Sequence, residues 1–246
     1  QIYQNAEEFY RAENGHAIGY FWGYKTAGIF QSQQDINNWI AAGNGVLQSN
    51  VQPGDVKYVD VNHDGAINAN DKVDLGNGLP KYTFGFNFTL GYKGFDLSAN
   101  FTGAAGFQIA QSYRDPSGSQ GNYSHRILGR WTGEGTSNEM PRVTYGDVGN
   151  WLFSDLYLQD GDYIRLQNLT LGYDFKKLIS WKGLSKLRLY FQVQNLFTLT
   201  KYDGMDPEIG SYNGTDGNSS DSWVSGVDMG YYPHPRTFIV GVNVAF

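Results

Sequence analysis

The stretch from residue 82 to residue 92 alternates without a break between apolar side chains and small or polar ones. One set of alternate positions holds Tyr82, Phe84, Phe86, Phe88, Leu90 and Tyr92, and the other holds Thr83, Gly85, Asn87, Thr89 and Gly91. A β-strand turns successive side chains to opposite faces, so this stretch predicts a strand over residues 80–92 with one apolar and one polar face. The apolar row begins and ends with tyrosine, which is enriched where a membrane meets water. This pattern favours a strand in the wall of a transmembrane β-barrel.

The same alternation predicts four more strands along the chain. They cover residues 94–107, 162–175, 186–199 and 237–246. Residues 92–94 are a tight-turn sequence, so the first two strands are expected to form an antiparallel hairpin. No Lys, Arg, Asp or Glu interrupts the middle of the apolar rows, as a lipid-facing surface requires.

The connections between these strands alternate in length, short and then long. Outer-membrane barrels have short turns at the periplasmic end and long loops outside, so the rhythm fits an all-β, antiparallel transmembrane barrel with long extracellular loops. A period of two also fits a β-sandwich. However, a sandwich usually carries Lys and Glu on its wet face, whereas here that face is mainly Asn, Thr, Ser, Gly and Gln.

Composition narrows the class of function. Of 246 residues, 32 are glycine and only 17% are charged, which suits a barrel with an uncharged polar interior. The net charge of −6 argues against a nucleic-acid surface, which would be basic. Cysteine is absent, so disulfides and thiolate metal sites are excluded.

An acidic, glycine-punctuated segment at residues 53–72 resembles a calcium-binding loop of the EF-hand or dockerin type. Its expected oxygen ligands are Asp60, Asn62, Asp64, the Ala66 carbonyl, Asn68 and Asp71, with the required glycine at Gly65. A hard cation takes six to eight oxygens, and alternate residues of a tight loop can aim them inward. We therefore predict a structural Ca²⁺ site. The alternative is a loop whose Asp and Asn side chains accept hydrogen bonds from backbone amides.

The sequence offers no catalytic motif. No nucleophile elbow, phosphate-binding loop or HExxH zinc motif occurs, and the four histidines lie in separate segments. Asp203, Asp206 and Glu208 are expected to form a solvated loop face rather than an acid/base pair. Arg188 lies on the polar side of its strand, where it meets an anionic solute or, as is more usual, pairs with a carboxylate of a neighbouring strand. We expect no enzyme activity.

Several motifs in fixed order carry a family resemblance. They are GDVKY at 54–58, GN at 76–77, LPKYTFG at 79–85, YKGFDL at 92–97, RWT at 130–132, DGDYIRL at 160–166, LGY at 171–173, QNLF at 194–197, DPE at 206–208, YPHPRT at 232–237 and the final Phe246. Together they resemble the C-terminal part of the barrel of a SusC/RagA-type TonB-dependent outer-membrane transporter. The resemblance covers nearly the whole chain from about Gly15.

This resemblance implies a barrel of about 22 strands in the Gram-negative outer membrane. It implies import of oligosaccharides or peptides under a SusD-like surface lipoprotein lid, with TonB contacting a plug domain. Residues 1–246 would be the last quarter or so of the transporter, a C-terminal portion of its barrel without the plug, and Phe246 resembles the signal read by the barrel-assembly machinery. The chain would then need the remainder of the barrel and outer-membrane lipid, because open sheet edges in lipid leave backbone groups unpaired.

Two other hypotheses stay open. One is a soluble, calcium-dependent extracellular β-sandwich that binds a ligand. The other is a secreted glycan-active enzyme, in which the aromatic side chains of Trp131, Trp151, Tyr212 and Trp223 would stack on sugar rings. Dependence on detergent would separate the membrane protein from the soluble module.

Overall fold

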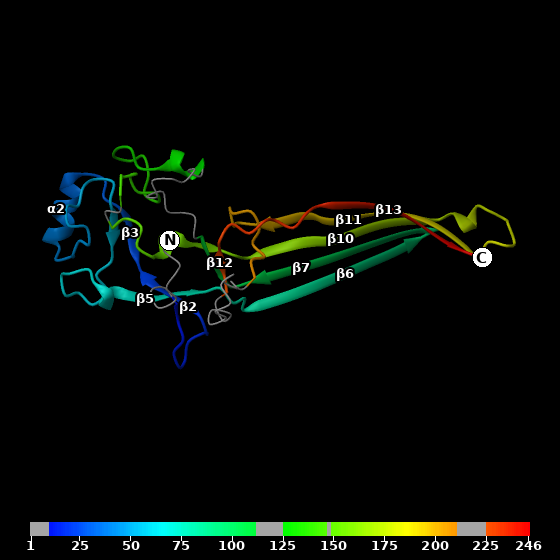
Figure 1. Ribbon diagram of the computed structural model, residues 1–246, viewed down its shortest axis with the longest axis horizontal. Coiled ribbons are helices and arrows are strands. Elements are labelled where there is room, and N and C mark those ends of the chain that lie inside the picture. Colours follow the sequence, from blue (N-terminus) through cyan, green and yellow to red (C-terminus); the bar gives the residue numbers. More distant parts are fainter. Residues whose placement is uncertain (1–9, 112–124, 147–148, 211–224) are drawn as a thin grey trace. The chain divides into compact units, whose positions relative to one another are not determined.

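The computed structural model describes residues 10–111, 125–146, 149–210 and 225–246 (Figure 1). Over these residues the chain is mainly antiparallel β-structure with one α-helix, α2 (Gln33–Ala41). No helix among them is long and apolar enough to cross a membrane.

The chain divides into two compact units, which we call the sheet unit and the loop unit. The sheet unit comprises Pro80–Phe107, Asp160–Glu208 and Tyr231–Phe246, and the loop unit comprises Gln1–Leu79, Gln108–Gln159 and Ile209–Gly230. The loop unit thus draws its residues from the long segments that precede or connect the strands of the sheet unit.

The sheet unit contains one five-stranded antiparallel sheet in the order β13-β11-β10-β7-β6. Its strands are β6 (Tyr82–Tyr92), β7 (Phe95–Ala105), β10 (Tyr163–Asp174), β11 (Lys186–Thr200) and β13 (Thr237–Ala245), with the 3₁₀ turn η5 (Phe175–Lys177) after β10. Each of these strands lies within two residues of its predicted bounds at either end. The predicted alternation is therefore confirmed as strand structure.

The turn between β6 and β7 has the geometry that its sequence predicts. Lys93 and Gly94 have φ angles of 48° and 99°. Two successive positive φ values are those of a type I′ turn, whose twist matches the right-handed twist of a hairpin. Glycine at the second position takes this conformation without strain, so the turn fixes the register of the first two strands.

Apolar residues face one another across the strands of this sheet. Phe86 pairs with Phe101, and Leu90 pairs with Leu97, which in turn pairs with Leu171 of β10. The ring centroids of Phe86 and Phe101 are 6.3 Å apart. The pairing of β10 with β7 and β11 shifts register between Leu166 and Asn168. Apolar residues continue on the same face on both sides of this shift, so the sheet has one apolar face and one polar face.

The loop unit is built from three small sheets. Their orders are β1-β2-β5, β12-β8-β9 and β3-β4, with strands β1 (Tyr10–Arg11), β2 (Tyr20–Tyr24), β3 (Thr26–Ile29), β4 (Val56–Tyr58), β5 (Lys72–Asn77), β8 (Gln108–Gln111), β9 (Leu158–Asp160) and β12 (Val227–Asp228). The 3₁₀ turns are η1 (Ala69–Asp71), η3 (His125–Gly129) and η4 (Asp155–Tyr157). The sequence predicts mostly irregular loops here, and the structure instead shows short strands.

These short strands are held by buried cores that join residues far apart in the sequence. The main core comprises Tyr10, Phe21, Ala110, Trp151, Phe153, Tyr157 and Val227, and a second comprises Tyr24, Val56 and Tyr58. Burying these large side chains is the main driving force that holds the segments together. The loop unit therefore has a hydrophobic interior of its own.

Side chains fix helix α2 at its N-terminus and to strand β4. Ser32 caps its N-terminus by accepting a hydrogen bond from the Asp35 amide at 3.2 Å, which satisfies one of the unpaired first-turn donors. Ile36 is its buried residue. The carboxylate of Asp35 also receives Lys57 Nζ, 2.7 Å away, which ties the helix to β4.

Candidate functional site

The apolar face of the sheet is exposed. Its exposed side chains are Tyr82, Phe84, Phe86, Phe88, Leu90, Tyr92, Phe95, Leu171, Leu189, Phe191, Phe197, Leu199, Phe238, Val240, Val242 and Val244. Phe86 is 59% exposed and Val240 71% exposed. Contiguous apolar patches of this extent are rare on monomeric soluble proteins and mark a surface that meets lipid or protein. A sandwich would need a second sheet on this face, and the described part of the sheet unit has none.

The polar face carries an ion pair that crosses three strands. Arg188 on β11 reaches over β10 and donates from Nε to Asp96 on β7 at 2.8 Å, while Nη2 contacts the second carboxylate oxygen. Gly172 lies between them on β10. A Cβ there would come within 2.6 Å of both side chains, so glycine leaves the necessary space. The prediction that Arg188 pairs with a carboxylate is confirmed, although the partner is two strands away.

A second cluster lies where the long connections leave the polar face. Arg165 is almost fully buried and donates to Asp206 at 2.5 Å, to Glu208 at 2.8 Å and to Thr198 at 2.9 Å. Asp206 also accepts from the backbone N–H of His234 at 3.1 Å and lies 3.0 Å from its ring Nδ1. The expectation of a solvated loop face is wrong for Asp206, which is 6% exposed. The cluster binds both ends of the long connection between β11 and β13 to β10.

The electrostatics of this cluster favour a charged carboxylate. Burial acts to raise the pKa of Asp206, but hydrogen bonds from the Glu208 and His234 amides, from the His234 ring and from Arg165 outweigh it and hold the pKa below its usual value. Because the Arg165 guanidinium donates hydrogen bonds to both Asp206 and Glu208, the two carboxylates belong to a structural ion cluster and do not form an acid/base pair.

The acidic loop is closed by hydrogen bonds to its own backbone. Asp60 accepts from the Gly65 amide at 2.7 Å, and Asp71 accepts from the amides of Val61 and Asn68 at 2.9 and 2.8 Å. Asp60 and Asp71 are both buried. These contacts are those of the alternative interpretation, in which the carboxylates bind backbone amides.

The remaining predicted ligands lie on the open side of the same loop. Asp64 is exposed and accepts from the Ala66 amide and from Asn62 Nδ2, each at 2.9 Å, while Asn68 accepts from Asn70. No group of three His, Cys, Asp or Glu side chains within the described residues is arranged to hold a metal ion. The donor set fits Ca²⁺ chemically, and calcium binding at this loop stays a prediction.

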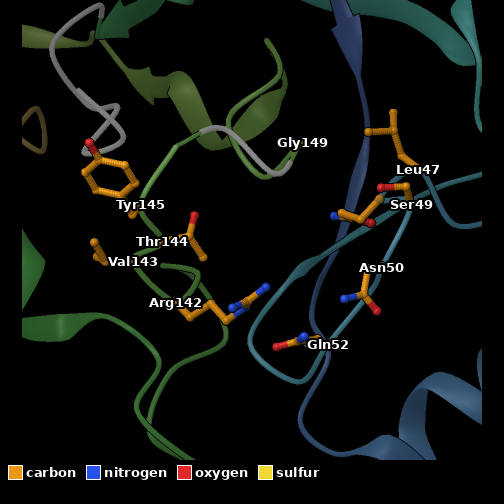
Figure 2. Close-up of a pocket in the computed structure, with 10 residues that line it drawn as sticks. Leu47, Ser49, Asn50, Gln52, Arg142, Val143, Thr144, Tyr145 and Gly149 are labelled. Atoms are coloured by element: carbon orange, nitrogen blue, oxygen red, sulfur yellow. The ribbon is translucent and has the colours of Figure 1, made fainter. Parts of the chain in front are cut away.

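The loop unit also contains a polar pocket of about 670 Å³ (Figure 2). It is lined by Leu47, Gln48, Ser49, Asn50, Gln52, Arg142, Val143, Thr144, Tyr145 and Gly149. In Figure 2 the Arg142 side chain extends toward the segment that carries Asn50 and Gln52. Amide, hydroxyl and guanidinium groups dominate the lining, and no carboxylate is among its described residues, so the pocket suits a ligand with many hydrogen-bonding groups.

The fully buried carboxylate of Asp55 holds two of the residues that line this pocket. Asp55 binds Arg142 Nε at 2.6 Å and the side-chain amide of Asn150 at 2.8 Å, and it accepts from the Gln52 backbone at 2.8 Å. Gln48 donates to the Val56 carbonyl at 2.9 Å. Sequence reasoning missed this network, although Asp55 stands in one of the family motifs.

Of the four aromatic residues proposed to stack on sugars, the structure describes Trp131 and Trp151, and both are engaged within the protein. Trp151 lies in the main core of the loop unit, and the Trp131 indole donates to Gln31 at 3.2 Å. Tyr212 and Trp223 fall outside the described residues.

Comparisons with known proteins agree with the sheet geometry. No family model matches the chain. The chain is 34% identical over 234 residues to TonB-dependent receptor P3 of Formosa agariphila, covering 94% of this chain and 22% of that protein. It is 28% identical over 205 residues to TonB-dependent receptor SusC of Bacteroides thetaiotaomicron, covering 82% of this chain and 18% of that protein.

A solved structure of the RagAB peptide transporter shares the fold. It matches with a TM-score of 0.66 at 21% identity, over 97% of this chain and 25% of that chain. The chain therefore spans about a quarter or less of the relatives that it matches. The predicted fold class, antiparallel strands that form part of a large transmembrane barrel, is confirmed.

Proposed function

This chain belongs to the SusC/RagA-type TonB-dependent receptors, and from that premise we propose that it forms the C-terminal section of the wall, with its outer loops, of an outer-membrane nutrient importer. The observation that carries the proposal is the exposed apolar face of the five-stranded sheet. In water this face would cost free energy at roughly 25 cal/mol for each Å² of apolar surface, and lipid removes that cost.

The edges of the sheet support the same function. β6 and β13 are its outermost strands, and within the described residues neither has a partner on its outer side. Unpaired backbone groups each cost several kcal/mol in a bilayer, so both edges need further strands. The rest of the barrel supplies these strands.

The importer is proposed to take up oligosaccharides or peptides. The name of the RagAB structure concerns peptides, whereas the polar pocket of the loop unit favours a solute rich in hydrogen-bonding groups. A SusD-like lipoprotein would cover the long loops. TonB would act through a plug domain that residues 1–246 do not include. The loop unit, with its own core, provides an ordered surface for such a lid.

Uptake by cells that produce the complete receptor tests this proposal. Labelled oligosaccharides and labelled peptides of similar mass are supplied in parallel, with and without a protonophore that removes the energy for TonB. Energy-dependent uptake of one pool is expected. A receptor that fractionates as a soluble protein without detergent would contradict the membrane assignment, whereas energy-independent leakage would contradict active import.

Loop substitutions then show whether the pocket meets the solute. Gln52→Ala removes an exposed amide of the pocket, and Gln33→Ala removes an exposed amide of α2 as the control. We expect a several-fold rise in the half-saturating solute concentration for Gln52→Ala alone. Equal uptake by both variants would place solute contacts elsewhere.

A further inference from the structure

The short-connection end of the sheet unit combines exposed aromatic residues with lysines. Strand pairing brings the β6–β7 turn, the β10–β11 connection and the end of β13 to the same end: Phe95 pairs with Tyr173, and Lys186 pairs with Ala245. The Asp174 amide also donates to the Gly94 carbonyl at 2.8 Å. Side chains from all three segments can therefore contact the same ligand.

Aromatic side chains form a belt at this end. The ring centroids of Phe95 and Tyr173 are 4.5 Å apart, and those of Trp181 and Phe246 are 6.1 Å apart. Trp181 and Phe246 are 60% and 84% exposed, and Leu178 beside them is also exposed. Amphipathic rings at the end of an apolar strand face are typical of the membrane interface.

Lysines lie just beyond this belt. Lys93, Lys182 and Lys186 are exposed, and none of them forms an ion pair with another described residue. Lys176 is used differently: its Nζ donates to the Trp181 carbonyl at 2.8 Å and shapes the connection. The Nζ of Lys93 lies 5.2 Å from the centroid of the Tyr92 ring. The cationic end thus has three exposed lysines without a carboxylate ion-pair partner among the described residues.

The acidic groups at this end are already engaged. Asp96 is held by Arg188, and Asp174 accepts a hydrogen bond from the Lys176 amide at 2.9 Å. The opposite end of the same strands has mixed charge: the acidic residues Asp160, Asp162, Asp203, Asp206 and Glu208 lie there together with Lys81, Arg165, Lys201 and Arg236. The basic end is therefore a local feature of a chain whose net charge is −6.

We propose that this end binds the headgroup of an anionic phospholipid. Lys93, Lys182 and Lys186 contact the phosphate, while Trp181 and Leu178 lie at the boundary with the acyl chains. Basic residues next to a membrane attract anionic lipid, and long lysine side chains reach from the apolar boundary to the headgroup layer. The proposal rests on membrane insertion in the proposed function but involves neither the solute nor the pocket.

Native mass spectrometry of the complete receptor, purified in a neutral detergent, tests the proposal. Phosphatidylglycerol is titrated against phosphatidylcholine, which has a phosphate but no net charge, and inorganic phosphate is added as a competitor. We expect tighter binding of phosphatidylglycerol and no displacement by millimolar phosphate. Equal affinity for the two lipids would overturn the proposal, and displacement by free phosphate would reassign the site to a simple anion.

Matched variants locate the site. The triple variant Lys93→Gln, Lys182→Gln, Lys186→Gln removes the cations of the short-connection end, and Lys81→Gln, Lys201→Gln, Arg236→Gln removes three exposed cations of the other end. A lysine near an anionic surface contributes about fivefold in affinity, so the first variant should bind phosphatidylglycerol about a hundredfold more weakly. The control should keep its affinity.

An equal loss in both triple variants would contradict the assignment to this end. If the triple variant assembles poorly, the single variant Lys182→Gln is used in its place. Its affinity for phosphatidylglycerol is expected to fall about fivefold. Recovery of each variant in the outer-membrane fraction is measured separately. Failure of the wild-type receptor to insert would count against the proposed membrane function, whereas its normal insertion without lipid preference would count against the lipid site alone.

Discussion

The loop unit buries its large apolar side chains, whereas the sheet unit exposes side chains of the same types. Phe21 and Tyr157 of the loop unit are completely buried, whereas Phe86 and Val240 of the sheet unit are mostly exposed. The loop unit covers its apolar side chains with its own chain. The sheet unit leaves them exposed. Under the proposed function lipid covers the exposed face of the sheet unit, whereas the loop unit needs no such cover.

The two units also place their charged groups differently. The loop unit buries Asp55 and surrounds its carboxylate with donors, because a buried charge is tolerated only when it is paired and hydrogen-bonded. The sheet unit keeps Arg188 and Asp96 on its polar face, away from the apolar rows. The comparison predicts that a misplaced charge and a lost partner will harm the two units differently.

The largest effect is expected at Asp55. Asp55→Ala leaves Arg142 and Asn150 without their shared partner, so the loop unit should lose about 3–5 kcal/mol of stability while the sheet stays inserted. Limited proteolysis of the complete receptor measures this as faster cleavage within the loops. Asp74→Ala, at a partly exposed carboxylate of the same unit, should change cleavage little. Loss of the inserted barrel in Asp55→Ala would break the separation of the two units.

Charge on the lipid face should have the next largest effect. Phe86→Arg places a cation among the apolar rows at a cost of about 2–4 kcal/mol at the bilayer midplane, whereas Asn87→Arg places it on the polar face. Heat-modifiable migration of the folded barrel on gels reports assembly. Phe86→Arg should reduce it strongly and Asn87→Arg only slightly. Equal assembly would remove the evidence that this face meets lipid.

Calcium should have a smaller effect and act on the loop unit alone. If the acidic loop binds Ca²⁺, calcium at ten times its dissociation constant stabilises that unit by about 1.4 kcal/mol. Protection of the loops from proteolysis, with calcium and with chelator, measures this. Asp64→Ala should abolish the protection, and Glu134→Ala, another exposed loop carboxylate, should retain it. Identical cleavage of the wild-type receptor with and without calcium would contradict calcium binding at this loop.

Acid should produce the smallest effect at ordinary pH, at the Arg165 cluster. The folded-state pKa of Asp206 lies below its ordinary value of 3.8, so its stabilising contribution is complete above about pH 4 and is lost as the pH falls through the lowered pKa. Hydrogen exchange at residues 201–208 should rise over that range. In Asp206→Asn the exchange should already be high at pH 7 and lose this component of its pH dependence. A wild-type profile that is flat between pH 5 and pH 2 would contradict the assignment.

Local periodicity predicted the sheet but not the loop unit. The strands of the sheet repeat every two residues, so their bounds and faces could be read from neighbouring positions. Tyr10, Ala110 and Val227 meet in one core although they are about a hundred residues apart, and no local pattern reports such contacts. The apolar run at residues 151–153 was the available signal.

The candidate sites follow the same division. Pairing of Arg188 could be predicted, because an arginine on the polar row of a strand needs a carboxylate. The burial of Asp206 could not be predicted, since it depends on Arg165, 41 residues earlier in the chain, and on His234. The oxygen spacing of the acidic loop suggests a metal, but the same side chains satisfy the loop's own amides.

The Arg188–Asp96 pair bears on how the strands find their correct alignment during assembly. Alternation excludes a slip by one residue, because that would turn every apolar side chain to the wrong face. It permits a slip by two, which keeps all faces in place. Such a slip would move the two charged groups roughly 7 Å apart along the strands, and Gly172 would no longer lie beneath them. The ion pair thus distinguishes the native register from its even-numbered alternatives, which the apolar pattern alone leaves equivalent.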